Sequence, residues 1–514
     1  MARSTVALVL LACLVGLSIA QEIQFAKAKK FWVWPMPAQS SIGESASWLD
    51  EYTFTIRTTK DSYTHDILKQ AFQRYNKLIA QNKGEMKLID YPMMPPKPDA
   101  APKMKIRALD VTVTQKVSTL SFGVDESYIL NISESKATLK ATTIFGALHG
   151  IETFSQLVQW NGTTMVIPYT PIYVADAPAW PWRGMLIDTA RHYQEVKSLE
   201  AIIDSMVYAK LNVFHWHLTD AESFPVVLPS VPEFADKGAW SKKAVYTKKD
   251  VEHITKYAMY RGIRVVPEID TPGHTYSFGH AHPEMITNCT GAINNNGTSY
   301  PGINNVALNI TNPNIYPLLD KIYGDIAAIF SDDFLHVGGD EVRPKCWNEF
   351  PSIKEWMASQ GMNTSDYNPM LRYFRLRLTP MILNRNKKMV VWQEALNEML
   401  TLGPENPLTP ANTIVQIWIN DNYQQLVGQY LTEGYPTLLS AGWYLDQQVP
   451  KPNPYADEEE DLIYSNATHY LDIDTWRDMY QVDPFGGQNL TAEQKALFMG
   501  GEVAQWSEAI MGSS

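Results

Sequence analysis

The stretch FLHVGGDEV places two carboxylates side by side, Asp340 and Glu341, directly after an apolar run and two glycines. Adjacent carboxylates repel each other, so their titrations separate, and one of them can hold its proton near or above about pH 5. Successive residues of an extended chain point to opposite sides, so the two side chains can reach different parts of one substrate. Gly338 and Gly339 would let backbone and ligand approach closely. The pattern predicts acid–base chemistry, although GGDE alone also fits a solvated turn after a buried strand.

Eight short apolar runs recur after residue 177, and segments with helical periodicity lie between them. The runs are GMLID, LNVFHWHL, IRVVPEI, DFLHVGG, KMVVWQE, TIVQIWI, PTLLSAGWY and FMGGEVAQW. Strands that alternate with helices run parallel, because each crossover connection needs room for a helix. Eight such units predict an α/β fold, a (β/α)₈ TIM barrel, whose active site lies at the carboxyl ends of its strands.

Carboxylates and indoles dominate the positions that follow these predicted strands. In chain order the polar and aromatic residues there are Asp188, Arg191, His215, His217, Asp220, Glu268, Asp270, His274, Asp340, Glu341, Trp392, Glu394, Trp418, Trp443, Tyr444, Asp446, Trp506 and Glu508. Sugar rings present apolar C–H faces that lie on aromatic rings, and hydroxyls that charged groups bind. Glycosidic cleavage needs an acid that protonates the leaving oxygen and a negative group that stabilises an oxocarbenium-like centre. The strand ends therefore predict a sugar-processing site.

The residues before the barrel indicate a small α+β domain over 21–175, and the barrel then spans 176–514. YTFTIRT and LDVTVTQ alternate like half-exposed strands, whereas DILKQAFQRYNKLIAQ has apolar residues at helical spacing. Residues 1–20 combine Arg3, an apolar core and a small-residue end at Ala20, which is typical of a cleaved signal peptide. A membrane anchor is the alternative, but this apolar run is too short to span a bilayer.

The composition favours a folded, exported protein. Apolar residues make up 45% of the chain, which suffices for a large core. The net charge of −12 disfavours nucleic acid and anionic membranes as partners, and we expect no membrane span. Acceptor sites for glycosylation occur at Asn131, Asn161, Asn288, Asn296, Asn309, Asn363, Asn466 and Asn489. Cys13 leaves with the predicted signal, and Cys289 and Cys346 remain either as a disulfide or as two free thiols.

The motifs RGMLIDTARHY, LNVFHWHLTD, RGIRVVPEIDTPGH, HVGGDEV, VVWQEA and SAGWYLD resemble, in this order, those of family 20 β-N-acetylhexosaminidases. The similarity runs from VWPMPAQ to GGEVAQWSE, which covers almost the whole predicted mature chain. The resemblance implies a retaining exo-glycosidase that removes terminal β-linked N-acetylglucosamine or N-acetylgalactosamine. It also implies substrate-assisted catalysis, in which the substrate's own acetamido oxygen attacks the anomeric carbon and forms an oxazolinium ion.

The resemblance also implies a role for each site residue. Glu341 matches the general acid/base, and Asp340 matches the carboxylate that holds the acetamido N–H and stabilises the cyclic ion. The other matches are Tyr444 for the acetamido carbonyl, Trp392 and Trp418 for the walls of the acetamide pocket, Trp443 as a further substrate-binding residue, Trp506 for the platform under the ring, Arg191, Asp446 and Glu508 for the sugar hydroxyls, and Asp220 with His274 for the pair that tunes Glu341.

Further expectations follow from the same resemblance. It implies neither a cofactor nor a metal, a disulfide between Cys289 and Cys346, a possible homodimer, and a lysosomal or secreted location. The substrate would be a glycan, a glycolipid or a chito-oligosaccharide. Members of the family continue past the last strand with a final helix, whereas this sequence stops at AIMGSS, so we expect that barrel helix to be missing.

Two other functions stay open from the sequence. A metal-dependent amidohydrolase could use His215, His217, His274, His280 and His282 as zinc ligands. That class usually carries its histidine pair on the first barrel strand, whereas the pair here follows the second. A sugar-binding protein of the same fold, with weak turnover or none, is the other alternative, and hydrolysis of a chromogenic β-N-acetylglucosaminide distinguishes it from the enzyme.

Overall fold

The computed structural model describes residues 33–50, 53–81, 105–160, 164–287, 303, 306–342, 347–348, 350–419, 422–446 and 476–507. The chain divides into two compact units, and each is described by itself. The first comprises Met1–Thr119, Val124–Ala179 and Tyr208–Lys210, and the second comprises Leu120–Gly123, Trp180–Val207 and Leu211–Ser514.

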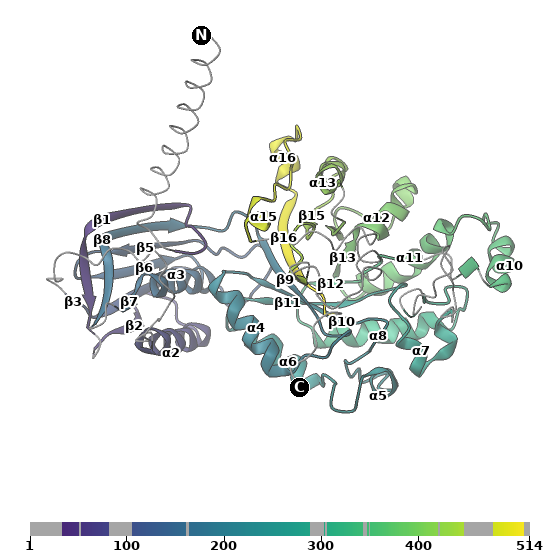
Figure 1. The fold of residues 1–514 in the computed structure, drawn as a ribbon, viewed down its shortest axis with the longest axis horizontal. Helices are drawn as coiled ribbons and strands as arrows, with labels where there is room; N and C mark the ends of the chain where they lie inside the picture. The colour runs from purple at the N-terminus through teal and green to yellow at the C-terminus, as the bar shows by residue number, and fades with distance from the viewer. Residues whose placement is uncertain are drawn as a thin grey trace, which may run out of the picture. The chain divides into compact units, whose positions relative to one another are not determined.

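In the described residues of the first unit, a mixed sheet packs with helices α2 and α3 (Figure 1). The sheet has the order β2-β4-β6-β5-β8-β1-β3, and β7 pairs with β8. The strands are β1 Gln39–Leu49, β2 Thr55–Thr58, β3 Lys105–Ile106, β4 Ala108–Val113, β5 Tyr128–Ile132, β6 Ala137–Ala141, β7 Gln159–Trp160 and β8 Met165–Asp176. Helix α2 spans Asp66–Gln81 and α3 spans Ile144–Leu157. Because α3 contacts α2 as well as strands β5 and β6, almost all of its surface is buried.

A closed parallel barrel forms the second unit, with the strand order β10-β11-β12-β13-β14-β15-β16-β9. The strands are β9 Trp182–Asp188, β10 Val213–Thr219, β11 Arg264–Ile269, β12 Phe334–His336, β13 Lys388–Trp392, β14 Thr413–Ile417, β15 Thr437–Leu439 and β16 Phe498–Gln505. Each coincides with one of the eight apolar runs, so the predicted TIM barrel, preceded along the chain by a small α+β domain, is confirmed.

Helices connect the barrel strands, as Figure 1 shows. They are α4 Val196–Tyr208, α5 Glu233–Gly238, α6 Lys248–Met259, α7 Phe278–Ala281, α8 Ile315–Ile329, α10 Pro351–Ser359, α11 Asn368–Leu383, α12 Gln393–Leu400, α13 Tyr423–Thr432, α15 Trp476–Gln481 and α16 Ala492–Lys495, with 3₁₀ turns η1 Pro283–Met285 and η3 Gly403–Glu405. Residues after Ser507 lie outside the described part, so the expected absence of a final helix stays a prediction. Among the described residues, no helix combines the length and apolar character that a membrane span needs.

The barrel interior changes from apolar to polar along the strands. One layer consists of the buried side chains Trp182, Val213, Val266, Phe334, Val390, Ile414 and Leu438. Residues two positions apart on a strand face the same side. The next layer along the strands therefore consists of His215, Glu268, His336, Trp392, Gln416 and Ser440, which are all buried. The apolar layer closes the barrel interior, and the polar layer lies toward the strand ends where the predicted site residues stand.

Candidate active site

Two glycines with left-handed backbone follow strand β12. Gly338 has φ +59° and Gly339 has φ +106°, conformations that L side chains rarely adopt. A Cβ atom at Gly338 would lie 1.8 Å from Asp270 Oδ1, and one at Gly339 would lie 1.7 Å from Arg375 Nη2. The two glycines let the backbone turn against the buried side chains of Asp270 and Arg375. The close approach of a ligand to them stays a prediction.

Asp340 presents a buried acceptor. Its Oδ1 atom has no hydrogen-bond partner among the described residues, and leaving a buried acceptor unpaired costs about 1–3 kcal/mol. Burial and the neighbouring Asp340 raise the pKa of Asp270 well above its usual value. Burial also raises the pKa of Asp340, with Glu341 adding to it, while His274 and the hydrogen bond to Asp270 oppose that rise. Asp340 is thus an oriented carboxylate with one oxygen unpaired among the described residues.

Glu341 stands next to it in a strained and accessible position. Its φ is +48°, which is uncommon for a residue other than glycine and is found at functional sites. Its side chain is 38% exposed, and its Oε2 lies 3.5 Å from Nε2 of His274. A carboxyl group that contacts both solvent and a buried imidazole can exchange protons with a substrate and with water.

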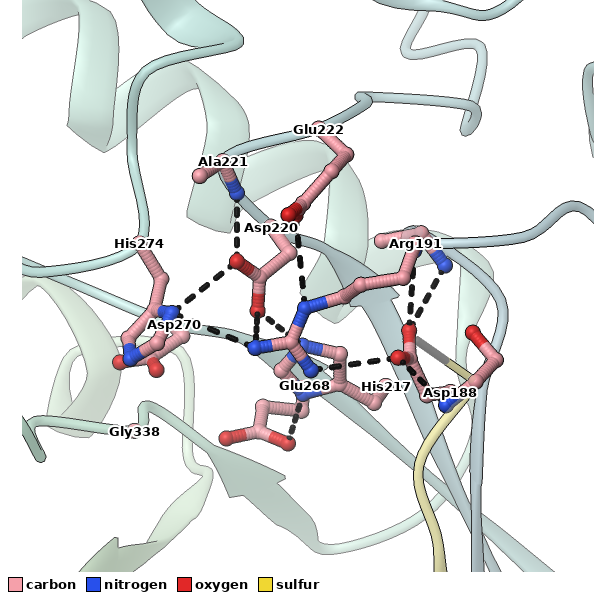
Figure 2. A network of polar contacts seen from close by, with 12 residues as sticks. Asp188, Arg191, His217, Asp220, Ala221, Glu222, Glu268, Asp270, His274 and Gly338 are labelled. Carbon is pink, nitrogen blue, oxygen red and sulfur yellow. Dashed lines mark hydrogen bonds and ion pairs between the residues drawn. The ribbon is translucent and has the colours of Figure 1, made fainter. Parts of the chain in front are cut away.

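A network of charged side chains surrounds Asp220 (Figure 2). Oδ1 of Asp220 accepts from Nδ1 of His274 at 3.0 Å, and Oδ2 accepts from Nε2 of His217 at 2.9 Å. Burial alone would raise the pKa of Asp220, but Arg191 and His274 hold it well below its usual value. Burial would lower the pKa of His274, but Asp220 raises it well above its usual value. The imidazole that faces Glu341 therefore carries a positive charge.

Arg191 is held by acids on three sides. Its guanidinium makes ion pairs with Asp188 at 3.1 Å, Asp220 at 2.9 Å and Glu222 at 3.4 Å. Its Cζ lies 5.0 Å from the ring centroid of Trp506. These contacts fix the predicted hydroxyl-binding arginine beside the predicted ring platform.

Four of the predicted aromatic residues come together at the strand ends. Trp392 and Tyr444 are buried in one cluster, with Trp418 and Trp506 packed against it. The ring centroids of Trp392 and Trp506 lie 6.2 Å apart, and those of Tyr444 and Trp506 lie 6.5 Å apart. Trp418 donates its Nε1 proton to both oxygens of Glu394, at 3.1 and 3.0 Å. The predicted walls and platform are thus neighbours, although they come from three separate strand ends.

Other predicted site residues remain predictions. Trp443 donates from Nε1 to the carbonyl of Met479 at 2.8 Å, and its ring blocks the space beside Gly501, so these contacts are with the barrel itself. Its role in substrate binding and that of Asp446 are untested. The predicted hydroxyl contact of Glu508 and the predicted disulfide between Cys289 and Cys346 concern residues outside the described part of the chain.

The glycosylation sites divide in the same way. Asn131, Asn363 and Asn489 are exposed and Asn309 is half-buried, whereas Asn161, Asn288, Asn296 and Asn466 lie outside the described residues. Exposure at three acceptor positions leaves room for a glycan there, and whether any is attached stays a prediction.

Three acids for which the sequence predicts no specific role also lie at the site. Glu268 accepts from Trp392 Nε1 at 2.8 Å. Burial, with the charge of Asp340, raises the pKa of Glu394 to about 8, and burial, with the charge of Asp220, raises that of Glu222 to about 7. The position of Glu268 and Glu394 at strand ends was the available signal. Their hydrogen bonds to tryptophans depend on the pairing of strands far apart in sequence.

The histidines considered as zinc ligands do not gather into one set. His215 lies between Glu268 and Glu502, whereas His282 pairs with Glu233 at 3.1 Å and with a second glutamate, Glu284. Within the described residues, two groups have potential ligand atoms within 4.8 Å of one another, His215 with Glu268 and His336, and Asp270 with His274 and Asp340. In the first group, His215 and His336 each lie 3.0 Å from a carboxylate oxygen of Glu268. In the second, His274 makes its ion-pair contacts with Asp220 and Glu341, which lie outside the group.

We expect the pair of His274 and Asp220 to stabilise the fold most at acid pH. The raised pKa of His274 gives a contribution that is complete below about pH 6.5 and is lost as the pH rises through the folded-state value. The lowered pKa of Asp220 gives a contribution that is complete above about pH 4 and is lost as the pH falls through its folded-state value. Between pH 5 and pH 9, the free energy of unfolding in urea should fall by about 1–3 kcal/mol more in the wild type than in His274→Gln. Equal pH dependence of the two proteins would contradict this.

Two family models match the chain. Residues 180–514 match the model described as "Glycosyl hydrolase family 20, catalytic domain", and residues 33–157 match the one described as "beta-acetyl hexosaminidase like".

Similar proteins agree with these models. The chain is 34% identical to the beta-hexosaminidase subunit beta of Felis catus, over 97% of this chain and 87% of the relative. It is 35% identical to the beta-hexosaminidase subunit A1 of Dictyostelium discoideum, over 78% of this chain and 68% of the relative. Among solved structures, the chitobiase of Flavobacterium johnsoniae has a TM-score of 0.71 and 26% identity, over 94% of this chain and 66% of that one. Together with the matched residues of the barrel, these similarities show that the chain belongs to glycosyl hydrolase family 20.

Proposed function

We propose that this chain hydrolyses terminal, non-reducing β-linked N-acetylglucosamine and N-acetylgalactosamine residues, with Asp340 and Glu341 carrying the reaction. The relatives named above are beta-hexosaminidases and a chitobiase, which supports the activity. The observation that carries the residue assignment is the buried Oδ1 of Asp340, which has no partner in the described part of the chain, beside the accessible Glu341. An acetamido N–H of the substrate would pair with that oxygen.

The first step forms a ring within the substrate. The carbonyl oxygen of the 2-acetamido group attacks the anomeric carbon, and the bond from this carbon to the leaving oxygen breaks. Glu341 donates its proton to the leaving oxygen, and the positive His274 beside it favours the carboxylate that results. Asp340 accepts the acetamido N–H and stabilises the positive charge of the oxazolinium ion.

The second step opens that ring with water. Glu341, now a carboxylate, takes a proton from the water, and the water oxygen bonds to the anomeric carbon. The bond between the acetamido oxygen and the anomeric carbon breaks, so the configuration at this carbon is retained overall. Glu341 regains its proton and the acetamide is restored.

The aromatic cluster makes this chemistry efficient. An internal nucleophile can reach effective molarities of about 10⁵–10⁸ M, provided that it is held in an attacking pose. Trp392 and Trp418 would enclose the acetamide methyl group, and the Tyr444 hydroxyl would bind its carbonyl oxygen. The hydrogen bonds of Trp392 to the buried Glu268 and of Trp418 to the half-buried Glu394 keep these walls in place.

Comparing an acetamido glucoside with a plain glucoside tests this function. We expect the nitrophenyl β-N-acetylglucosaminide to be hydrolysed at least about 10⁴-fold faster, by kcat/KM, than the nitrophenyl β-glucoside, because the plain sugar lacks both the nucleophile and the anchor. Similar rates for the two glycosides would contradict the proposal. Binding of the acetamido glycoside without release of nitrophenol would favour a sugar-binding protein instead.

The cellular context is proposed on coarser grounds. The eukaryotic beta-hexosaminidase relatives and the exposed acceptor asparagines support a place in the secretory pathway, ending in the lysosome or outside the cell. We propose glycans, glycolipids or chito-oligosaccharides as substrate classes. A homodimer is proposed from the family resemblance alone.

A further inference from the structure

One buried carboxylate in the barrel, that of Glu268, contacts both the predicted acetamide pocket and the network of charged side chains around Asp220. Glu268 stands on β11, has no exposed surface, and belongs to the polar layer above the apolar layer of the barrel. Its Oε1 accepts from Trp392 Nε1 at 2.8 Å, and its Oε2 lies 2.5 Å from Nδ1 of His217. Burial would raise the pKa of Glu268, but the neighbouring histidines hold it well below its usual value. Glu268 is thus a charged carboxylate, and each of its two oxygens contacts a different side chain, Trp392 or His217.

The Oε1 contact leads to the acetamide pocket. Trp392 is the fully buried member of the aromatic cluster, and Glu268 is the acceptor of its indole proton. A buried indole N–H without an acceptor costs about 1–3 kcal/mol, so the ring would shift if this acceptor were lost. The position of the pocket wall therefore depends on Glu268.

The Oε2 contact leads to the general acid. Nε2 of His217 lies 2.9 Å from Oδ2 of Asp220, and Oδ1 of Asp220 lies 3.0 Å from Nδ1 of His274. Nε2 of His274 in turn lies 3.5 Å from Oε2 of Glu341. Both ring nitrogens of His217 are engaged, Nδ1 with Glu268 and Nε2 with Asp220 (Figure 2). The chain of contacts is continuous from the barrel interior to the side chain that protonates the leaving group.

We propose that Glu268 is a positioning residue that fixes the acetamide-pocket wall through Trp392 and the general acid through His217, Asp220 and His274. This inference rests on the proposed function. In this view one carboxylate positions both the pocket that holds the nucleophile and the group that donates the proton. The first step of the reaction needs both groups in place at the same time.

A second buried glutamate in the same barrel provides a matched control. Glu502 is 1% exposed and binds Trp182 Nε1 at 2.7 Å, His215 Nδ1 at 2.8 Å and Gln416 Nε2 at 2.9 Å. These contacts do not include Trp392 or His217. His215 also lies 3.0 Å from Glu268 Oε2, so Glu502 is joined to Glu268 only through this histidine. Replacing Glu502 therefore perturbs the barrel interior while the direct contacts of Glu268 with Trp392 and His217 remain.

The test uses two acetamido glucosides that differ in their need for an acid. A dinitrophenyl group leaves with little help from a proton, whereas a methoxyphenyl group needs the proton. In Glu268→Gln, the amide oxygen can still accept from Trp392, but the charge beside His217 is gone. We expect kcat to fall at least about tenfold for the methoxyphenyl glycoside and less than about threefold for the dinitrophenyl glycoside, with KM nearly unchanged.

Two further variants separate the connections. The methionine in Glu268→Met cannot accept a hydrogen bond from Trp392 or His217. This variant should show the same leaving-group dependence and, in addition, a KM raised about tenfold for the acetamido substrate. His217→Gln keeps a donor for Asp220 but loses the contact with Glu268. It should reproduce the leaving-group dependence without the change in KM, and it serves if the Glu268 variants fail to fold. Glu502→Gln should show equal small losses for both glycosides.

The outcomes distinguish this inference from the proposed function. If the wild type fails to hydrolyse either acetamido glycoside, the proposed function is wrong. If the wild type is active and the folded Glu268 and His217 variants lose the same factor on both glycosides, the positioning role of Glu268 is wrong and the proposed function stands. Leaving-group dependence in Glu502→Gln as large as in Glu268→Gln would also overturn the inference.

Discussion

Glu341→Gln is expected to lower kcat for a β-N-acetylglucosaminide with a poor leaving group by about 10²–10⁴-fold, while KM changes little. Glutamine has the size of glutamate but cannot donate a proton to the leaving oxygen or take one from water. The sugar would still bind, because Arg191 and the aromatic cluster remain. Steady-state kinetics, with substrate binding followed by tryptophan fluorescence, measure both parts.

The matched control for this variant is Glu355→Gln, an exposed glutamate on α10, which should leave both constants unchanged. A correctly folded Glu341→Gln protein with near-normal turnover would contradict the assignment of the general acid. A large rise in KM with unchanged kcat would instead make Glu341 a binding group.

Asp340→Asn is expected to lower kcat by about 10²–10³-fold, because the cyclic ion loses the negative charge that stabilises it. The amide also presents an N–H group where the substrate's own N–H needs an acceptor. Kinetics on the same acetamido glycosides measure the effect. Because the negative charge stabilises the ion that forms when the acetamide attacks, kcat should fall for substrates with good leaving groups and for those with poor ones.

The control is Asp333→Asn, an exposed acid just before β12, which should behave as the wild type. An unchanged rate in Asp340→Asn would mean that the substrate's acetamide is not positioned by this residue. The nucleophile would then have to be sought elsewhere in the site.

Local periodicity predicted most of the fold. DILKQAFQRYNKLIAQ became helix α2 with the same bounds, and each apolar run after residue 177 became a barrel strand. These patterns succeed because side chains that repeat at the helix or strand period bury one face whatever lies around them. The long pairing of β1 with β8 in the first unit joins segments more than a hundred residues apart, and no local pattern encodes it.

The site was predictable to the extent that residues follow strands. Asp340, Glu341, Asp220 and His274 were expected to lie together for this reason, because the ends of parallel strands meet at one side of a barrel. The structure brings them together, and their roles in catalysis stay predictions. The partners inside the barrel were not, since the contact of Glu268 with Trp392 depends on how β11, β12 and β13 are aligned. The steric reason for a glycine at position 338 could not be predicted either. The side chain that leaves no room for a Cβ atom there belongs to Asp270, at the end of another strand.

The most direct test of the account replaces the acetamido group by mono-, di- and trifluoroacetamido groups on one aryl glycoside. Each fluorine withdraws electrons from the carbonyl oxygen and makes it a weaker nucleophile, while the rest of the substrate is unchanged. If the sugar's own amide attacks the anomeric carbon beside Asp340, kcat/KM falls steeply and steadily along the series. A rate that stays level across the series would mean that a group of the protein attacks instead, and it would contradict the central claim.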